Sequence, residues 1–400
     1  MICSAPDYLP LSFCSFIRHF LNLFTFKSYN IEIKKDNHKT ILGYSCRSLF
    51  YIFMDFMSKK NDNLTIVTTP IHHTSYRNII EKFVKPENIH IIKMNKNYNK
   101  IENLPSVDNC DVVIITHLFG QDLILKDFTA FKKKHNCLFV EDRVQGGKIY
   151  KNSESIFDIS FYSCGMDKRP VALGGGFVNI KNDSKNYNEL NIFFKNTINS
   201  YPKESRFDRF LFLFKKIPTY FLYNSKIFIY FFIKILNIFN FDIISFAKYY
   251  RKKNPGFEHG AFLKNPSEPL LKSIHQEINN TDHIENLYSE KFSKFKSLKN
   301  MKNYIKWYNN NNLLTPYNTF YIDKSNLTTF KNYMKKHNIC VVDNPTYKIF
   351  NHFYEGKIQD KYFNDSLIYM PSLANMNDDE MNYLIKILNN YENSICHNNF

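Results

Sequence analysis

Glycine is scarce in this sequence. Only 11 of the 400 residues are glycine, less than half the average usage of about 7%. A chain so poor in glycine keeps it where the backbone needs a positive φ or a close approach to another group. Most of the glycines fall in one short stretch, namely Gly120, Gly146, Gly147, Gly165, Gly174, Gly175 and Gly176. This stretch is therefore where we look for a functional site.

The eight cysteines show neither a disulfide pattern nor a metal-binding one. Their spacing is irregular, and no two of them form a Cys-x-x-Cys pair. In a chain of this length that argues against a disulfide framework and against a zinc site, so we expect no bound metal. The first residues, MICSAPDY, lack the positive segment that opens a signal peptide. We therefore expect a reducing, cytoplasmic compartment.

Long runs of like charge are absent, although the chain is basic. It carries 53 Lys and Arg against 37 Asp and Glu, a formal net charge of +16, and the basic residues are spread along its length. No zinc-finger, RNA-recognition or basic-zipper motif is present, so we expect no nucleic-acid partner. The charge favours acidic partners such as nucleotide diphosphates or an anionic membrane face. The length predicts about two domains.

Short apolar, β-rich runs in the first half of the chain predict buried strands at residues 64–69, 90–94, 111–116 and 137–141. Residues 121–135 between the last two have one apolar side and predict an amphipathic helix. Strand, helix and strand at this spacing form a βαβ unit, which predicts a parallel sheet. Runs at 158–164 and 176–180 continue the sheet. Sites in such sheets lie at the carboxyl ends of the strands.

Residues 206–250 differ in composition, because they are rich in Phe, Ile and Leu. Pro218 suits a helix start. Residues 226–248 predict a helix with one apolar face and one mixed face, the latter holding Lys226, Lys234, Asn237, Asn240, Ser245 and Lys248. The charges interrupt it too often for a membrane span, which needs about 20 apolar residues. Two interpretations stay open: a helix lying in a membrane interface, or one packed in a subunit contact.

The last part of the chain predicts a smaller α/β domain. It combines helices at 267–299 and 377–392, the latter capped by Asn377, with strands at 314–322 and 339–342. We divide the chain into an N-terminal arm (1–40), a large domain (41–200), an apolar amphipathic helical insertion (201–255) and a small C-terminal domain (256–400).

Three motifs follow the predicted strands: VEDRVQG at 140–146, FYSCGMDK at 161–168 and LGGG at 173–176. In this order and spacing they resemble the DegT/DnrJ/StrS family of sugar aminotransferases, which are pyridoxal-phosphate (PLP) enzymes of fold type I. That family shows Glu-Asp-Ala-Ala-Gln, Phe-Ser-Phe-x-x-x-Lys and Gly-Glu-Gly-Gly at these places. HLFGQ at 117–121 is similar to the family's His-Leu-Tyr-Gly-Gln, and SCRSL at 45–49 stands where the family begins a helix. The resemblance covers residues 40–190 well, 256–392 weakly and 200–255 hardly.

The resemblance implies a role for each matching residue. Lys168 would be the catalytic lysine that holds PLP as a Schiff base and moves a proton, and Asp142 would pair with the pyridinium nitrogen. Gln145 would lie against the ring. Ser163 and the helix start at Arg47 and Ser48 would bind the phosphate. A histidine after Pro70 would stack on the ring, and of His72 and His73 we select His73.

The sequence also departs from the family pattern. Cys46 and Arg47 replace its glycine and threonine, and Arg143 and Val144 replace alanines. Gly174 stands where the family often has Glu, and its Asn-x-Arg element is not recognisable near residues 263–265.

The resemblance implies a PLP-dependent aminotransferase that acts on a keto-sugar nucleotide for surface glycan biosynthesis, with glutamate as amino donor, and that works as a homodimer. Peripheral membrane contact through residues 206–250 is a separate expectation. Two alternatives remain. One is a non-catalytic binding or scaffold protein at a membrane-bound glycan assembly. The other is a sugar dehydratase of the same family, a branch in which histidine replaces the lysine, so that Lys168 argues against it.

Overall fold

The computed structural model describes residues 11–34, 37–95, 100–118, 123, 128–145, 156–166, 168, 170–238, 261–280, 290–291, 293, 305–307, 318–322, 324–339, 341–343, 367–371, 373 and 376–398. Gly120, Gly146 and Gly147 lie outside these residues, as do parts of the helices predicted at 121–135, 226–248 and 267–299 and the first residues of the strand predicted at 314–322.

One large sheet organises the first half of the chain. Its eight strands run in the order β1-β2-β10-β9-β8-β7-β3-β4, and they span Glu32–Lys34 (β1), His38–Gly43 (β2), Ile66–Thr68 (β3), Ile89–Ile91 (β4), Val112–Thr116 (β7), Leu138–Asp142 (β8), Ile159–Ser163 (β9) and Gly176–Lys181 (β10). Strands β4, β3, β7, β8 and β9 are parallel, as the βαβ pattern predicts. Strand β10 is antiparallel to β9 and to β2. The carboxyl ends of β7, β8 and β9 therefore meet along one edge.

Alternating residues of the central strands build the core on both faces of this sheet. Val112 and Ile114 of β7 pack under α2 (Cys46–Lys60), α3 (Thr74–Phe83) and α5 (Tyr187–Ser200). Val113 and Ile115 face the other way, toward Phe128 at the start of α4 (Phe128–His135). This alternation follows from the two-residue repeat of a strand. The sheet is thus covered on both faces, as parallel sheets are.

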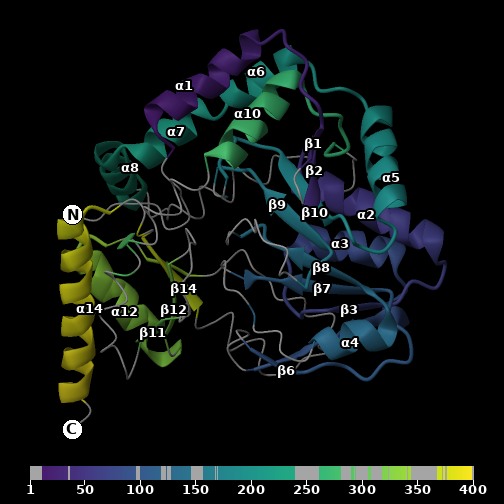
Figure 1. The fold of residues 1–400 in the computed structure, drawn as a ribbon. Helices are drawn as coiled ribbons and strands as arrows, with labels where there is room; N and C mark the ends of the chain where they lie inside the picture. Colours follow the sequence, from purple (N-terminus) through teal and green to yellow (C-terminus); the bar gives the residue numbers. More distant parts are fainter. Residues whose placement is uncertain are drawn as a thin grey trace.

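The C-terminal part forms a second, antiparallel sheet, at the left of Figure 1. Its strands run in the order β11-β12-β14-β13, and they span Ile305–Trp307 (β11), Asn318–Ile322 (β12), Val342–Asp343 (β13) and Leu367–Met370 (β14). Helices α12 (Lys324–Lys336) and α14 (Asp378–Asn398) share its core. Asn377 closes a capping box with Glu380 at the start of α14, as predicted. Tyr369 of β14 joins the core under the large sheet.

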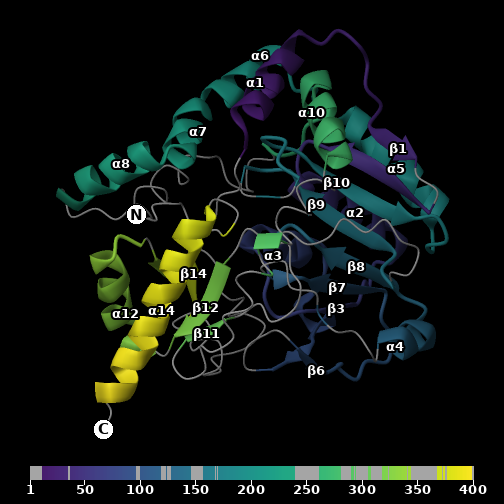
Figure 2. The same ribbon diagram turned by 60° about the vertical axis from the view of Figure 1, so that its left-hand side comes forward.

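A group of helices extends from the large sheet along one rim of the molecule, α1 (Phe13–Leu21), η1 (Asn22–Phe24), α6 (Arg206–Phe214), α7 (Ile217–Asn224) and α8 (Lys226–Ile238). Figures 1 and 2 both show α6, α7 and α8 following the upper edge, with α1 beside them. The Phe16 ring of α1 stacks on Tyr220 of α7 at 4.0 Å. Helix α10 (Glu268–Asn279) joins this group to the sheet, because its Leu270 and Ile274 pack on Tyr162 and Phe177. The predicted boundary at residue 256 stays a prediction.

The remaining short elements complete the description. They are η2 (Pro86–Asn88), β5 (Lys93–Met94) and β6 (Ile101–Asn103), of which the two strands pair with each other.

Candidate active site

The start of helix α2 lies directly against the glycine motif at the start of β10. Ser45 caps α2: its hydroxyl accepts from the Ser48 N–H at 3.0 Å, and the Ser48 hydroxyl accepts from the Ser45 N–H at 3.1 Å. Gly176 is the point of closest approach, because a Cβ there would lie 2.5 Å from the Cys46 nitrogen and 2.7 Å from the Tyr162 carbonyl oxygen. Only glycine allows α2 to begin so close to the sheet.

Ser163 ends strand β9 at the same place. It is half-buried and pairs in register with Gly176 across the β9–β10 ladder. The structure therefore brings Ser163 and the first turn of α2 to either side of one glycine. The N–H groups of Cys46 and Arg47 have no acceptor within the helix, as at every helix start, so this turn can bind an anion. These are the predicted phosphate-binding elements, and the structure places them together.

Lys168 lies on the loop that connects β9 to β10. Both ends of this loop are tied to each other: the Cys164 N–H donates to the Gly175 oxygen at 3.1 Å, and the Gly174 N–H donates to the Cys164 oxygen at 3.0 Å. Gly175 has a φ of +82°, which the return of the loop to β10 requires. Lys168 itself donates its backbone N–H to the Gly165 oxygen and is half-buried.

Asp142 ends strand β8 and is buried. Its Oδ1 accepts from the Val144 N–H at 2.9 Å, and its Oδ2 lies 3.5 Å from the Thr116 hydroxyl at the end of β7. Burial raises the pKa of Asp142 to about 6, although the Val144 N–H and the charge of Lys168 favour the ionised form. Lys168 and Arg47 likewise oppose the burial that raises the pKa of the Cys46 thiol. The charge of Lys168 thus acts on both Asp142 and Cys46.

His72 supports Asp142 through Thr116. Its Nδ1 lies 2.6 Å from the Thr116 hydroxyl, and its Nε2 lies 2.6 Å and 3.3 Å from the hydroxyls of Thr68 and Thr69. Burial lowers the pKa of His72 to about 3, so the ring is neutral at pH 7 and has a single N–H. The same Thr116 hydroxyl lies 3.5 Å from Asp142 Oδ2, so the neutral ring and the carboxyl group flank one hydroxyl.

A second buried network lies behind Asp142. The Glu141 carboxylate accepts from Arg143 Nε at 2.7 Å, lies 3.1 Å from His117 Nε2, and accepts from the Ser160 hydroxyl. Burial alone would raise the pKa of Glu141, but Arg143 and these hydrogen bonds outweigh it and lower the pKa. Arg143, a departure from the family pattern, therefore neutralises the buried carboxylate beside Asp142.

The other predicted residues lie as follows. His73 is exposed and caps α3, because its Nδ1 accepts from the Ser75 N–H at 3.2 Å. Its neighbour His72 is the histidine that the structure connects to Asp142. Ser48 is buried, with its hydroxyl and N–H both used in the capping box. Gln145 is buried in the turn after β8, and Arg47 lies with its guanidinium 5.8 Å from the Phe262 ring centroid.

Thr116, Glu141 and Ser160 were missed by the sequence interpretation. Thr116 had a signal, since it ends a predicted parallel strand and such ends gather at one edge. Glu141 also had one, because it stands at the first residue of the family's Glu-Asp-Ala-Ala-Gln motif. Ser160 had none, because only strand pairing sets it beside Glu141.

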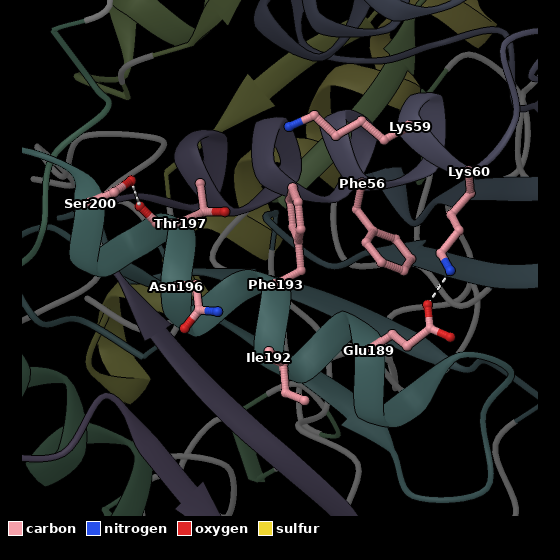
Figure 3. A pocket seen from close by; sticks show the side chains of 9 residues that line it. All are labelled: Phe56, Lys59, Lys60, Glu189, Ile192, Phe193, Asn196, Thr197 and Ser200. Atoms are coloured by element: carbon pink, nitrogen blue, oxygen red, sulfur yellow. Dashed lines mark hydrogen bonds and ion pairs between the residues drawn. The ribbon is translucent and has the colours of Figure 1, made fainter.

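A surface hollow of about 610 Å³ lies elsewhere, between the last turns of α2 and helix α5 (Figure 3). Its charged lining residues are already engaged: Lys60 pairs with Glu189, and Lys59 pairs with Asp55 and lies over the Phe193 ring. A helix rises about 1.5 Å per residue, so the two ends of α2 are roughly 20 Å apart. This hollow is therefore separate from the site at Ser45 and Gly176.

Comparison with known proteins identifies the fold. No protein-family model and no curated protein matches the sequence. Among solved structures, Helicobacter pylori PseC, an aminotransferase involved in the biosynthesis of pseudoaminic acid, superposes with a TM-score of 0.65 at 13% identity, over 98% of this chain and 99% of that chain. Spr1654 from Streptococcus pneumoniae, assigned as a sugar aminotransferase, gives 0.66 at 10% identity in its PMP form, over 97% and 98%. The GDP-4-keto-6-deoxymannose-3-dehydratase ColD gives 0.58 at 10%, over 95% and 93%.

The chain thus has the fold of fold-type-I PLP enzymes of the DegT/DnrJ/StrS sugar-aminotransferase type over nearly its whole length. The predicted fold class is confirmed. At such identities the likeness establishes the fold, and the chemistry has to be argued from the residues.

Proposed function

We propose that this protein is a PLP-dependent aminotransferase that transfers an amino group from glutamate to a keto-sugar nucleotide in surface glycan biosynthesis. The observation that carries the proposal is that Asp142 ends β8 while Lys168 lies on the loop between β9 and Gly176, at the edge of the sheet where α2 begins. It is supported by the fold shared with PseC and with Spr1654, which has been solved in both PLP and PMP forms.

The residues at this site fit the cofactor. PLP carries a phosphate, a pyridine nitrogen and an aldehyde, and the site offers a matching group for each. The first turn of α2, with the Ser163 hydroxyl and the Arg47 guanidinium, suits a dianion. Asp142 suits a protonated ring nitrogen, and Lys168 supplies a primary amine. When bound, PLP would supply an electron sink for the negative charge that develops at the substrate carbon.

The roles of this chain's own residues follow from their surroundings. Lys168 would hold the cofactor through Nζ and, once released, would move a proton at that same atom. Asp142 would hold the proton of the pyridine nitrogen, kept in place by the Val144 N–H, with the Thr116 hydroxyl between it and His72. Thr116 and His72 act through Asp142, so they are positioning residues. Gln145, buried beside Asp142, would lie against the ring.

A dehydratase is the second candidate, because ColD shares the fold. Lys168 favours the aminotransferase, since the dehydratase branch has histidine at the corresponding place.

The test uses purified protein with added PLP. We expect visible absorbance that depends on Lys168: the Lys168→Ala variant should lose it, and Lys185→Ala, which alters an exposed lysine bonded to the Asn136 carbonyl, should keep it. The proposal is contradicted if Lys168→Ala keeps the visible absorbance of the wild type. It is also contradicted if the wild-type protein does not bind PLP. Turnover of a panel of keto-sugar nucleotides with glutamate then separates transamination from dehydration by the product, because transamination leaves an amino group on the sugar, whereas dehydration removes a hydroxyl and adds no nitrogen.

A further inference from the structure

The exposed apolar side chains of this protein are concentrated on the rim helices α1, η1, α6, α7 and α8 and the residues directly after η1. Of the large hydrophobic side chains that are exposed in the described part of the chain, all but Ile192 and Tyr383 lie there. They are Phe13, Ile17, Leu21, Phe24, Phe26, Phe207, Phe210, Leu211, Phe214, Phe221, Ile227, Phe228, Phe231, Ile235 and Ile238. A concentration of this size marks an interaction surface.

Helix α6 shows most clearly an outward face that is apolar and an inward face that carries a charged residue. Its exposed residues Phe207, Phe210, Leu211 and Phe214 recur with the spacing of a single helix face, while Arg209 on the opposite side is only 2% exposed. A helix packed on a soluble protein normally buries the phenylalanines and exposes the arginine. Helix α1 repeats the pattern, with Phe13, Ile17 and Leu21 exposed and Phe16 buried.

Helix α8 adds an apolar face bordered by a lysine. At about 100° per residue, its exposed residues Ile227, Phe228, Phe231, Ile235 and Ile238 fall within one arc of roughly 120°, and Lys234 lies at the edge of that arc. The aliphatic stem of a lysine at such a border can follow apolar groups while its ammonium reaches charged ones. The sequence predicts Lys234 on the mixed face of this helix, parts of which lie beyond residue 238 and outside the described residues.

The rim is also strongly basic. Residues 11–27 and 206–238 together contain eight Lys and Arg and a single acidic residue, Asp208, although Arg209 is buried and Arg18 pairs with Glu277. Lys27, Lys215 and Lys234 are exposed among the apolar side chains. Phenylalanine and isoleucine with interspersed lysine are typical of helices that lie in the interface of an anionic bilayer. Within the described chain, no helix is both long and apolar enough to cross a membrane.

We propose that the rim helices dock this protein flat on a bilayer that contains anionic lipid. A second copy of the chain fits this surface less well, because a two-fold contact would set the same basic patch against itself. The apolar stripes on α1, α6 and α8 would enter the boundary between headgroups and acyl chains, while the lysines contact the headgroups. The inference does not depend on catalysis.

The test is co-flotation of the purified full-length protein with vesicles. We expect binding to vesicles of phosphatidylcholine with phosphatidylglycerol, weaker binding to phosphatidylcholine alone, and partial loss at high salt. The double variant Phe228→Glu with Phe231→Glu changes positions that are 61% and 58% exposed. It should bind vesicles at least about tenfold more weakly than the wild type, because two apolar side chains no longer leave water on binding. Ile192→Glu, at a position 60% exposed on α5, is the matched control and should bind like the wild type.

A charge variant keeps the test decisive if the double variant fails to fold. Lys215→Glu with Lys234→Glu leaves the apolar stripes intact and should lose the preference for phosphatidylglycerol, with an unchanged circular dichroism spectrum. Absence of wild-type binding, or equal losses in the rim variant and the Ile192 control, overturns the proposal. The proposal is also overturned if wild-type protein does not bind vesicles and sediments as a dimer that the rim variant converts to a monomer. A second copy would then cover the rim.

Discussion

Asp142 is a buried carboxyl whose pKa is raised to about 6 by burial, so its charge changes just below neutral pH. A protonated pyridine nitrogen needs the carboxylate, which is present only above that pH. We therefore expect the affinity for PLP to increase as the pH rises through about 6. In Asp142→Asn this increase should shrink to the part due to the phosphate's own ionisation, and binding at pH 8 should weaken by about 10- to 100-fold. Fluorescence titration with PLP at several pH values measures both effects, and an identical profile in the two proteins would contradict the assignment.

At the residue scale, motif spacing predicted which side chains gather but not how they are held. Asp142 and Ser163 could be placed at the sheet's carboxyl edge because each ends a predicted strand, whereas Lys168 and Arg47 were assigned from the resemblance to the family motifs. The selection of His73 over His72 had no support in the sequence, because adjacent residues differ only in which one turns inward. From the sequence, Arg143 is expected to be an exposed charged residue in a loop. Only the tertiary structure shows that it pairs with the buried Glu141.

At the element scale, the close contact between α2 and β10 depends on Gly176 having no side chain. In Gly176→Ala the new Cβ would meet the backbone of Cys46 and Tyr162 rather than a side chain, so the start of α2 must move. We expect a loss of about 1–3 kcal/mol in the free energy of unfolding, together with weaker PLP binding. Gly43→Ala is the comparison: its Cβ would lie 2.6 Å from Cγ of the buried Leu49 side chain, so it should also cost stability, but without meeting the backbone at the start of α2. Urea unfolding and PLP titration of both variants test this, and equal affinities would show that α2 does not position the phosphate.

The elements that the sequence predicted are those with a strong local pattern. The buried parallel strands are continuous apolar runs, and α14 has a capping signal, so both were found. Strands β1 and β2 were missed because at least half of their residues are polar, and their place in the sheet comes from antiparallel pairing with distant residues. Helix α1 was missed because its outward face is apolar, contrary to the pattern expected of a soluble helix.

At the scale of the whole molecule, the free energy of unfolding depends on pH through every buried group that gains or loses a proton on unfolding. His19 is an example. Burial, aided by the charges of Arg209 and Arg18, lowers the pKa of His19 to about 3. The unfolded chain takes up that proton near pH 6.5, so His19 destabilises the fold progressively as the pH falls from about 6.5 toward 3. Between pH 7 and pH 5 the loss is about 2 kcal/mol. His19→Gln should therefore flatten the dependence of the urea midpoint on pH. Equal slopes in His19→Gln and the wild type would refute this.

The closed ends of the β9–β10 loop have a consequence for how readily the lysine meets an aldehyde. Lys168 follows Cys164 by four residues, so its Cα cannot stray more than about 14 Å from that anchor. A short tether fixed at both ends keeps the amine at a local concentration in the millimolar range or above, whatever the protein concentration in solution. The loop thus holds a single amine close to the site. Lengthening the loop would lower the local concentration of that amine.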